Sequence, residues 1–128
     1  MHDQKITEQE ISNLVDDFYA RVRQDTGIGP IFNQAIEDWP AHLALLKNFW
    51  STVLLTTGAY KGDPMMTHLK LPLEPRHFRR WLALFAETAN QVLPAAHAAE
   101  VIRKSERIAQ NFQAGLAHKR GEQPGFLT

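Results

Sequence analysis

The sequence contains no cysteine, which removes several kinds of chemistry at once. Disulfide bonds, catalysis by a thiolate and zinc sites built from thiolates are all excluded. The sequence also has no excess charge of either sign, because its 14 Lys and Arg residues balance its 14 Asp and Glu residues. We therefore find no electrostatic reason to expect nucleic acid or an anionic membrane as a partner.

Long apolar runs are missing as well. The first ten residues, MHDQKITEQE, lack the apolar segment of a secretory signal. No run approaches the roughly 20 residues that span a bilayer. A length of 128 residues, 44% of them hydrophobic and 22% charged, is typical of a single globular domain, here residues 1–128. We expect a cytoplasmic protein whose polar tail, residues 121–128, is frayed.

Apolar residues recur at the spacing of an α-helix in four segments, and no window alternates as a β-strand would. The first segment follows a capping box, in which Thr7 and Glu10 each satisfy a free N–H group of the other. It is expected to end near Gly27, with a short turn at Ile31–Phe32 after it. The other three begin beside prolines, which suit a first helical turn: Pro40, Pro75 and Pro94. The sequence predicts an all-α protein with four main helices.

The stretch YKGDPMMTHLKLP, residues 60–72, interrupts the helical pattern and carries His68. Pro64 and Pro72 stiffen the backbone on either side of this histidine. Because neutral imidazole is a suitable iron ligand, His68 is a candidate axial ligand for a planar iron cofactor.

Large aromatic rings are numerous for four helices. They are Phe18, Tyr19, Phe32, Phe49, Trp50, Phe78, Trp81 and Phe85. Such rings fill a core or line a flat apolar cavity. In a cavity, Tyr19, His42 and Trp81 would offer an O–H, an imidazole N–H and an indole N–H opposite His68. In a plain core, His42 is an edge residue and Tyr19 reaches a backbone carbonyl.

The order and spacing of five stretches are specific. They are FYARVRQD (18–25), GPIF (29–32), HLALLKNFWSTVLLTTGAYKGDPMMTHLKLP (42–72), HFRRWLALFAET (77–88) and ERIAQNFQAGL (106–116). In these stretches the chain resembles the group III truncated haemoglobins of bacteria. The resemblance implies a two-over-two helical globin fold that holds one haem b.

The resemblance also implies a role for each site residue. His68 matches the proximal iron ligand. Tyr19, His42 and Trp81 match the distal tyrosine, histidine and tryptophan. The site would then place three hydrogen-bond donors on the side of the haem opposite His68.

Other residues would complete the haem pocket. Phe32 matches the phenylalanine that packs on the haem face, and Leu46 and Phe49 match pocket-lining positions. The haem propionates have several candidate partners, among which the sequence does not choose: Tyr60, Lys61, Lys70, Arg76 and Arg79. His77 opens the third helix and is expected to be partly exposed, with a propionate contact as the alternative. His97 is expected to face solvent.

These residues indicate a haem protein that binds oxygen, nitric oxide, carbon monoxide and other diatomic gases, as oxygen-transport proteins do. Three donors exceed what reversible storage requires, so nitric oxide detoxification or a peroxidase-like reaction is expected as well. Either reaction would need an external electron donor, because we expect no reductase domain within 128 residues. The alternatives are a haem-based sensor or carrier, and a cofactor-free α-helical interaction module, which would be colourless.

Overall fold

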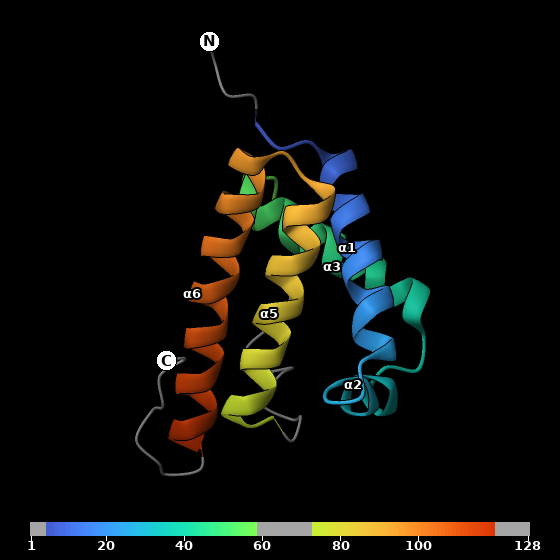
Figure 1. Ribbon diagram of the computed structural model, residues 1–128, viewed down its shortest axis with the longest axis vertical. Coiled ribbons are helices and arrows are strands. Elements are labelled where there is room, and N and C mark those ends of the chain that lie inside the picture. The colour runs from blue at the N-terminus through green and yellow to red at the C-terminus, as the bar shows by residue number, and fades with distance from the viewer. Residues whose placement is uncertain (1–4, 59–72, 120–128) are drawn as a thin grey trace.

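The computed structural model describes residues 5–58 and 73–119, with side chains described as far as residue 115. Within these ranges every regular element is a helix (Figure 1). The helices are α1 (Glu8–Gln24), α2 (Gly29–Ala35), α3 (Trp39–Leu55), α5 (Pro75–Val92) and α6 (Ala95–Lys119). The all-α prediction is confirmed. Among the described helices, none is long and apolar enough to cross a bilayer.

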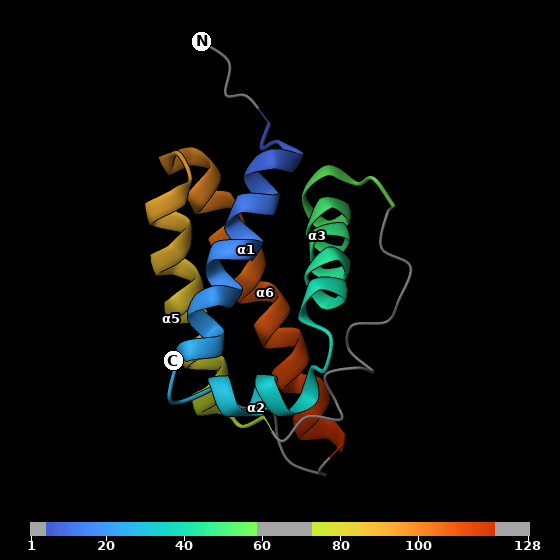
Figure 2. The same cartoon turned by 90° about the vertical axis from the view of Figure 1, so that its right-hand side faces the viewer.

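The four long helices form two antiparallel pairs. Helix α5 lies beside α6, to which it is joined by a short link at Leu93 and Pro94, and α1 lies beside α3 (Figures 1 and 2). Helix α1 also packs against α5 and so holds the two pairs together, while α2 lies across the end of α1. This is the two-over-two arrangement that the sequence predicts.

The starts of α1 and α3 are fixed by side-chain caps. The Glu10 N–H donates to the Thr7 hydroxyl at 3.1 Å, and the Thr7 N–H donates to Glu10 Oε1 at 2.9 Å. The predicted capping box is therefore confirmed. At α3, the Ala41 N–H donates to the Asp38 carboxylate at 3.1 Å, with Pro40 in the first turn. Each cap satisfies a backbone donor that has no partner inside its own helix.

Helix α2 corrects the predicted short turn at Ile31–Phe32. The segment Gly29–Ala35 is a helix of seven residues with Pro30 in its first turn. A Cβ on Gly29 would lie only 2.9 Å from the Val22 carbonyl oxygen. The glycine therefore allows α2 to begin directly against the last turn of α1. A helix of two turns is too short for its apolar spacing to be recognised.

The centre of the core is a stack of three aromatic rings. Phe85 lies between Trp50 and Trp81, with centroid distances of 5.2 and 5.3 Å and interplanar angles of 17° and 11°. Phe18 meets Phe85 edge-on at 5.0 Å. Since these rings come from α1, α3 and α5, one cluster joins three helices that are distant in the sequence. The same stack sets the position of Trp81.

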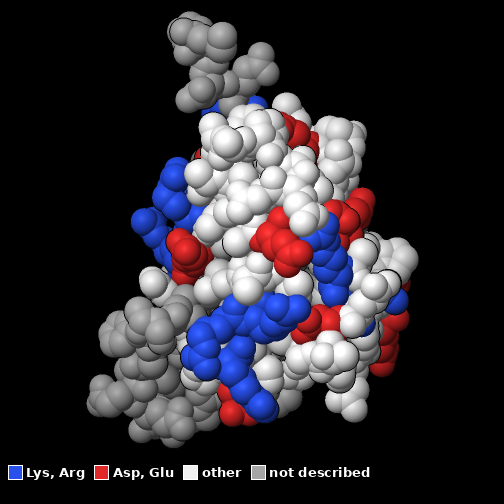
Figure 3. Space-filling view, viewed as in Figure 1, with Lys and Arg blue, Asp and Glu red and all other residues white. Residues whose placement is uncertain are grey.

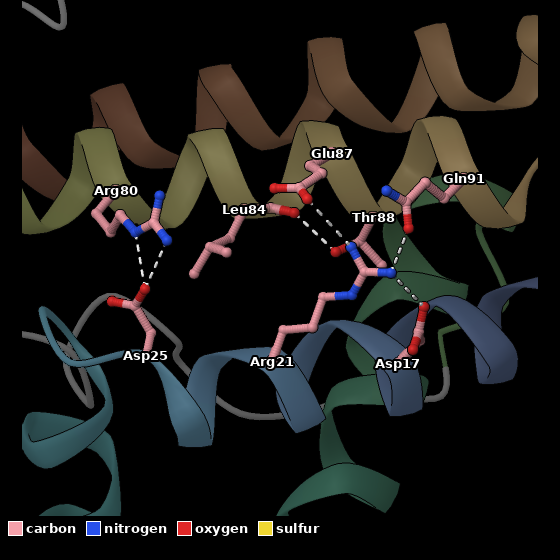
Figure 4. Close-up of polar contacts among 8 residues, drawn as sticks. All are labelled: Asp17, Arg21, Asp25, Arg80, Leu84, Glu87, Thr88 and Gln91. Carbon is pink, nitrogen blue, oxygen red and sulfur yellow. Dashed lines mark hydrogen bonds and ion pairs between the residues drawn. The ribbon is translucent and has the colours of Figure 1, made fainter.

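An ion pair between Arg80 and Asp25 joins α5 to the turn that follows α1 (Figure 4). Arg80 donates to Asp25 Oδ1 from Nη2 at 2.7 Å and from Nε at 2.8 Å. The other carboxylate oxygen accepts the N–H groups of Gly27 and Ile28 at 2.9 and 3.0 Å. The Arg80 hydrogen bond holds the pKa of the Asp25 carboxyl below its ordinary value. The N–H groups of Gly27 and Ile28 also lower this pKa, whereas burial raises it in part. Asp25 is therefore ionised wherever the protein is folded at neutral pH.

Asp25→Asn is expected to lower the free energy of unfolding by about 1–3 kcal/mol at pH 7, because charged hydrogen bonds are lost. The folded-state pKa lies below the unfolded value of about 3.9, so this contribution is complete above roughly pH 4 and is lost as the pH falls through the folded-state pKa. Urea unfolding at several pH values should show wild type and variant converging in acid. The matched control is Asp16→Asn, whose carboxylate is 53% exposed and pairs with Lys47, and we expect it to change stability by less than about 1 kcal/mol.

Candidate functional site

Tyr19 and Trp81 form the polar centre of the candidate site. Tyr19 lies on the inner face of α1 with 5% of its surface exposed, and Trp81 lies half-buried on α5. Burial raises the pKa of the Tyr19 hydroxyl well above its ordinary value, and a hydrogen bond with Trp81 opposes part of this rise. An indole N–H only donates, so the Tyr19 oxygen is the acceptor. The Tyr19 proton therefore remains available for another group.

Trp39 connects this pair to the predicted distal histidine. Its ring centroid lies 6.1 Å from that of Tyr19 and 5.9 Å from that of His42, which it meets edge-on. On its outer side, the Arg23 guanidinium lies 4.7 Å from the Trp39 centroid. The structure thus places Tyr19, Trp81 and His42 in one aromatic neighbourhood. Sequence reasoning missed Trp39, because it lies directly before Pro40 and outside the run of apolar residues that predicts the helix.

A cavity opens beside Trp81. Its described lining consists of Phe32, Leu73, His77, Phe78, Trp81, Ile108, Ala109 and Phe112. It has about 370 Å³ of atom-free space, which includes open solvent at its mouth. The residues around it form an apolar wall. Phe32 and Trp81 were predicted for the site and His77 only as an alternative propionate contact, while Leu73 and Ala109 were not predicted to line it.

Two further predicted pocket residues lie on α3 with His42. Leu46 and Phe49 are half-buried and pack against the main core, where Phe49 meets Trp50 edge-on at 5.7 Å. Their contact with a haem stays a prediction. The predicted proximal ligand His68 and the predicted cofactor contact Tyr60 lie outside the described residues, as do Lys61 and Lys70.

Two histidines differ from the sequence prediction. His77, expected to be partly exposed, is buried with 8% exposure, and its Nδ1 accepts the Glu74 N–H at 2.8 Å. His97, expected to face solvent, has a side chain only 13% exposed, and its Nδ1 lies 2.9 Å from Glu10 Oε2. Both were misjudged because each lies in the first turn of a helix, where a histidine is often exposed. Their partners become visible only when the helices are packed.

Gln113 on α6 is the buried side chain that lacks hydrogen bonds. It is 4% exposed, and neither its amide nitrogen nor its amide oxygen has a partner within the described part of the chain. A buried amide without partners costs free energy that an apolar side chain of similar size does not. Sequence reasoning did not single out this residue, since a glutamine in a helix is usually exposed.

Gln113→Met is therefore expected to raise the free energy of unfolding by about 1–3 kcal/mol, since it keeps the side-chain length and removes the two unpaired polar atoms. Urea unfolding without added ligand would measure this difference. Gln110→Met, on an exposed position of the same helix, is the matched control and should change stability by less than about 0.5 kcal/mol. A less stable Gln113 variant would contradict the prediction.

Comparisons with known proteins place the chain in a family. The model of the bacterial-like globin family matches residues 3–114, so the chain belongs to the bacterial-like globins. It is 40% identical over 113 residues to the group 3 truncated hemoglobin ctb of Campylobacter jejuni, covering 84% of this chain and 89% of that protein. The crystal structure of a group III truncated hemoglobin from Campylobacter jejuni matches with a TM-score of 0.83 and 38% identity, covering 91% and 95% of the two chains. The predicted fold family is confirmed.

Globins bind their ligands through haem, and the described site fits this group. A haem has a flat apolar body with two carboxylates at one edge, and the cavity offers an apolar wall that includes the rings of Phe32, Phe78 and Phe112. The polar groups beside the wall are few, and the hydroxyl proton of Tyr19 is not used by Trp81. The chain is therefore a haem-based ligand-binding protein of the globin family.

Proposed function

We propose that the protein binds oxygen and other diatomic gases at a haem b held by His68, and that it supports redox chemistry on them. Tyr19, Trp81 and His42 are the distal residues, and Phe32, Leu46, Phe49 and Tyr60 contact the cofactor. Nitric oxide dioxygenation and a peroxidase-like reaction are the two candidate reactions. Family membership supports haem over the cofactor-free interaction module.

The burial of the Tyr19 hydroxyl in the aromatic cluster with Trp81 is the observation that carries this proposal. Tyr19 is 5% exposed, and Phe18 packs edge-on against both Tyr19 and Trp81. An indole N–H only donates, so Trp81 leaves the hydroxyl proton of Tyr19 to other partners. Because burial raises the pKa of Tyr19, the phenol keeps this proton at neutral pH. The result is a buried donor inside an apolar site, where a hydrogen bond to a partly negative atom is strong.

Each residue then has a definite task. When bound, the haem iron supplies the coordination position for the gas and the capacity for electron transfer. Tyr19 donates a hydrogen bond to the ligand, and Trp81 holds Tyr19 in place. His42, half-buried on α3, controls access or adds another donor. The aromatic wall excludes water, and an external electron donor supplies electrons for turnover.

The test is an absorption spectrum of the purified protein, reduced with and without carbon monoxide, beside two histidine variants. We expect an intense Soret band that shifts with carbon monoxide in the wild type. His68→Ala should lose or displace this band because the axial ligand is gone. His42→Ala is the control: it removes a histidine on the distal side and should keep the band and its shift.

Two results would overturn the proposal. A colourless wild type that also refuses added haemin would exclude haem binding. An unchanged spectrum in His68→Ala would exclude His68 as the axial ligand and leave the iron to another residue.

A further inference from the structure

His77 differs from every other residue of the cavity wall. It is the one titratable side chain among the described residues that line the cavity, whose other members are apolar or aromatic. It is buried, although it is the third residue of α5 and has the exposed Arg76 and Arg79 close by in the sequence. A titratable ring in an apolar wall needs a physical reason, since burial of an imidazole costs free energy.

The hydrogen bond at Nδ1 fixes the state of this ring. The Glu74 N–H lies 2.8 Å from Nδ1, and a backbone N–H only donates. Nδ1 must therefore present a lone pair, and the neutral ring carries its proton on Nε2. Burial lowers the pKa of His77, with the charge of Arg76 acting in the same direction and that of Glu74 against it, so the ring is neutral at pH 7. Among the described residues, one makes a hydrogen bond to this ring, at Nδ1.

The surroundings of His77 favour a negatively charged group with an apolar body. The wall itself is apolar, and its rings suit such a body. At the surface, Arg76 has a side chain 70% exposed, and its ion pair with Glu74 is long, at 3.4 Å. Figure 3 shows basic side chains gathered over the end of the molecule where α5 begins. Exposed arginines on either side of His77 in the sequence and one N–H donor in the wall match a carboxylate attached to a hydrophobic molecule.

We propose that His77 holds a carboxylate of the molecule bound in this cavity by donating its Nε2–H to a carboxylate oxygen. Two molecules supply that chemistry: haem, through a propionate, and a free amphipathic carboxylate such as a fatty acid. The haem case rests on the proposed function, whereas the fatty acid case does not. Glu74 acts as a positioning residue, because its N–H sets the tautomer that leaves the proton on Nε2.

Two variants separate this donor from the structural role of the ring. His77→Asn places an amide oxygen near the position of Nδ1, so it keeps the acceptor for the Glu74 N–H and removes the Nε2 donor. His77→Gln places an amide NH₂ near the position of Nε2, so it restores the donor, and its amide oxygen can still accept the Glu74 N–H, as glutamine does at this position of a capping box. If the ring served only as a cap, both variants would keep the acceptor and should release haemin at similar rates.

The first measurement is the rate at which wild type and both variants release haemin to a scavenger, compared with haemin dimethyl ester, which lacks free carboxylates. We expect His77→Asn to release haemin roughly tenfold faster than wild type and His77→Gln to stay within about threefold. The three proteins should release the ester at similar rates. Equal acceleration with haemin and with the ester would mean that the ring acts through packing, and it would overturn the haem case.

The second measurement uses the haem-free protein and octanoate, followed by the ¹⁵N resonances of the His77 ring. Before addition, the spectrum should show a proton on Nε2 and none on Nδ1. Octanoate that shifts the Nε2 resonance, and that binds His77→Asn roughly tenfold more weakly, would identify a free carboxylate as the ligand. No effect of octanoate, together with unchanged haemin release, would refute the role of His77. A wild type that refuses haemin would refute the proposed function alone, and the octanoate result would still decide the role of His77.

Discussion

Replacing Tyr19 by phenylalanine is expected to speed oxygen dissociation from the haem-loaded protein by roughly 10- to 150-fold. The estimate follows from a hydrogen bond to a partly charged acceptor, worth about 1.5–3 kcal/mol, with about 1.4 kcal/mol for each factor of ten. The variant keeps the ring, so the edge-on contact with Phe18 at 4.7 Å should survive. The loss is then that of one O–H donor. Stopped-flow displacement of oxygen by carbon monoxide measures the rate.

Carbon monoxide provides the internal control. It carries little negative charge when bound, so its dissociation rate should change much less than that of oxygen in the same variant. A second control is Trp81→Phe, which keeps a ring in the stack on Phe85 and removes the indole N–H beside Tyr19. We expect it to speed oxygen release by a smaller factor than Tyr19→Phe, because the donor is loosened and not deleted. An unchanged oxygen rate in Tyr19→Phe would remove Tyr19 from the distal site.

Phe85→Ala is expected to cost about 3–5 kcal/mol of stability, the usual range for deleting a buried aromatic ring. Phe85 is 1% exposed and lies between the rings of Trp50 and Trp81. Its removal therefore leaves a cavity that two rigid rings cannot easily fill. Since a domain of this size has a total stability of about 5–15 kcal/mol, the variant should be close to unfolding. Urea unfolding followed by fluorescence would measure the change.

The matched control for this prediction is Leu45→Ala. Leu45 is a large apolar residue that is 46% exposed on α3, so its truncation should cost less than about 1 kcal/mol. If Phe85→Ala cost as little as the control, the three-ring stack would contribute packing that the rest of the core can replace.

Much of the fold can be predicted from the sequence because its signals are local. The capping box at Thr7 and Glu10 lies within four residues, and prolines mark the first turns of α3 and α5. The spacing of apolar residues along α1 predicts its inward face correctly, and along α5 it does so except at Val92, which is 37% exposed. Such signals depend on hydrogen bonds and burial within a single helix, so they do not require knowledge of the packed structure.

The remaining features depend on contacts between helices. From the sequence, Gly29 indicates only the end of the first helix. Its role in the close approach of α2 to α1 depends on the Val22 carbonyl, which lies next to it only in the packed structure. His77 lies in a polar context, and its burial depends on the cavity wall formed with α6. Trp39 has no periodic neighbours that distinguish it. In each case the role of the residue depends on a contact between helices, and a single sequence does not show which helices will be in contact.

Helix α1 has core partners at two different distances along the chain. Helices α2 and α3 follow it closely, whereas α5 lies in the second half of the chain. Phe18 contacts Phe85, and Glu10 pairs with His97, so these contacts join residues from opposite halves. We therefore expect α1 to pair with α3 during synthesis, while the part of its face that packs on α5 stays uncovered until α5 has emerged. During that interval the chain is open to chaperones and to aggregation.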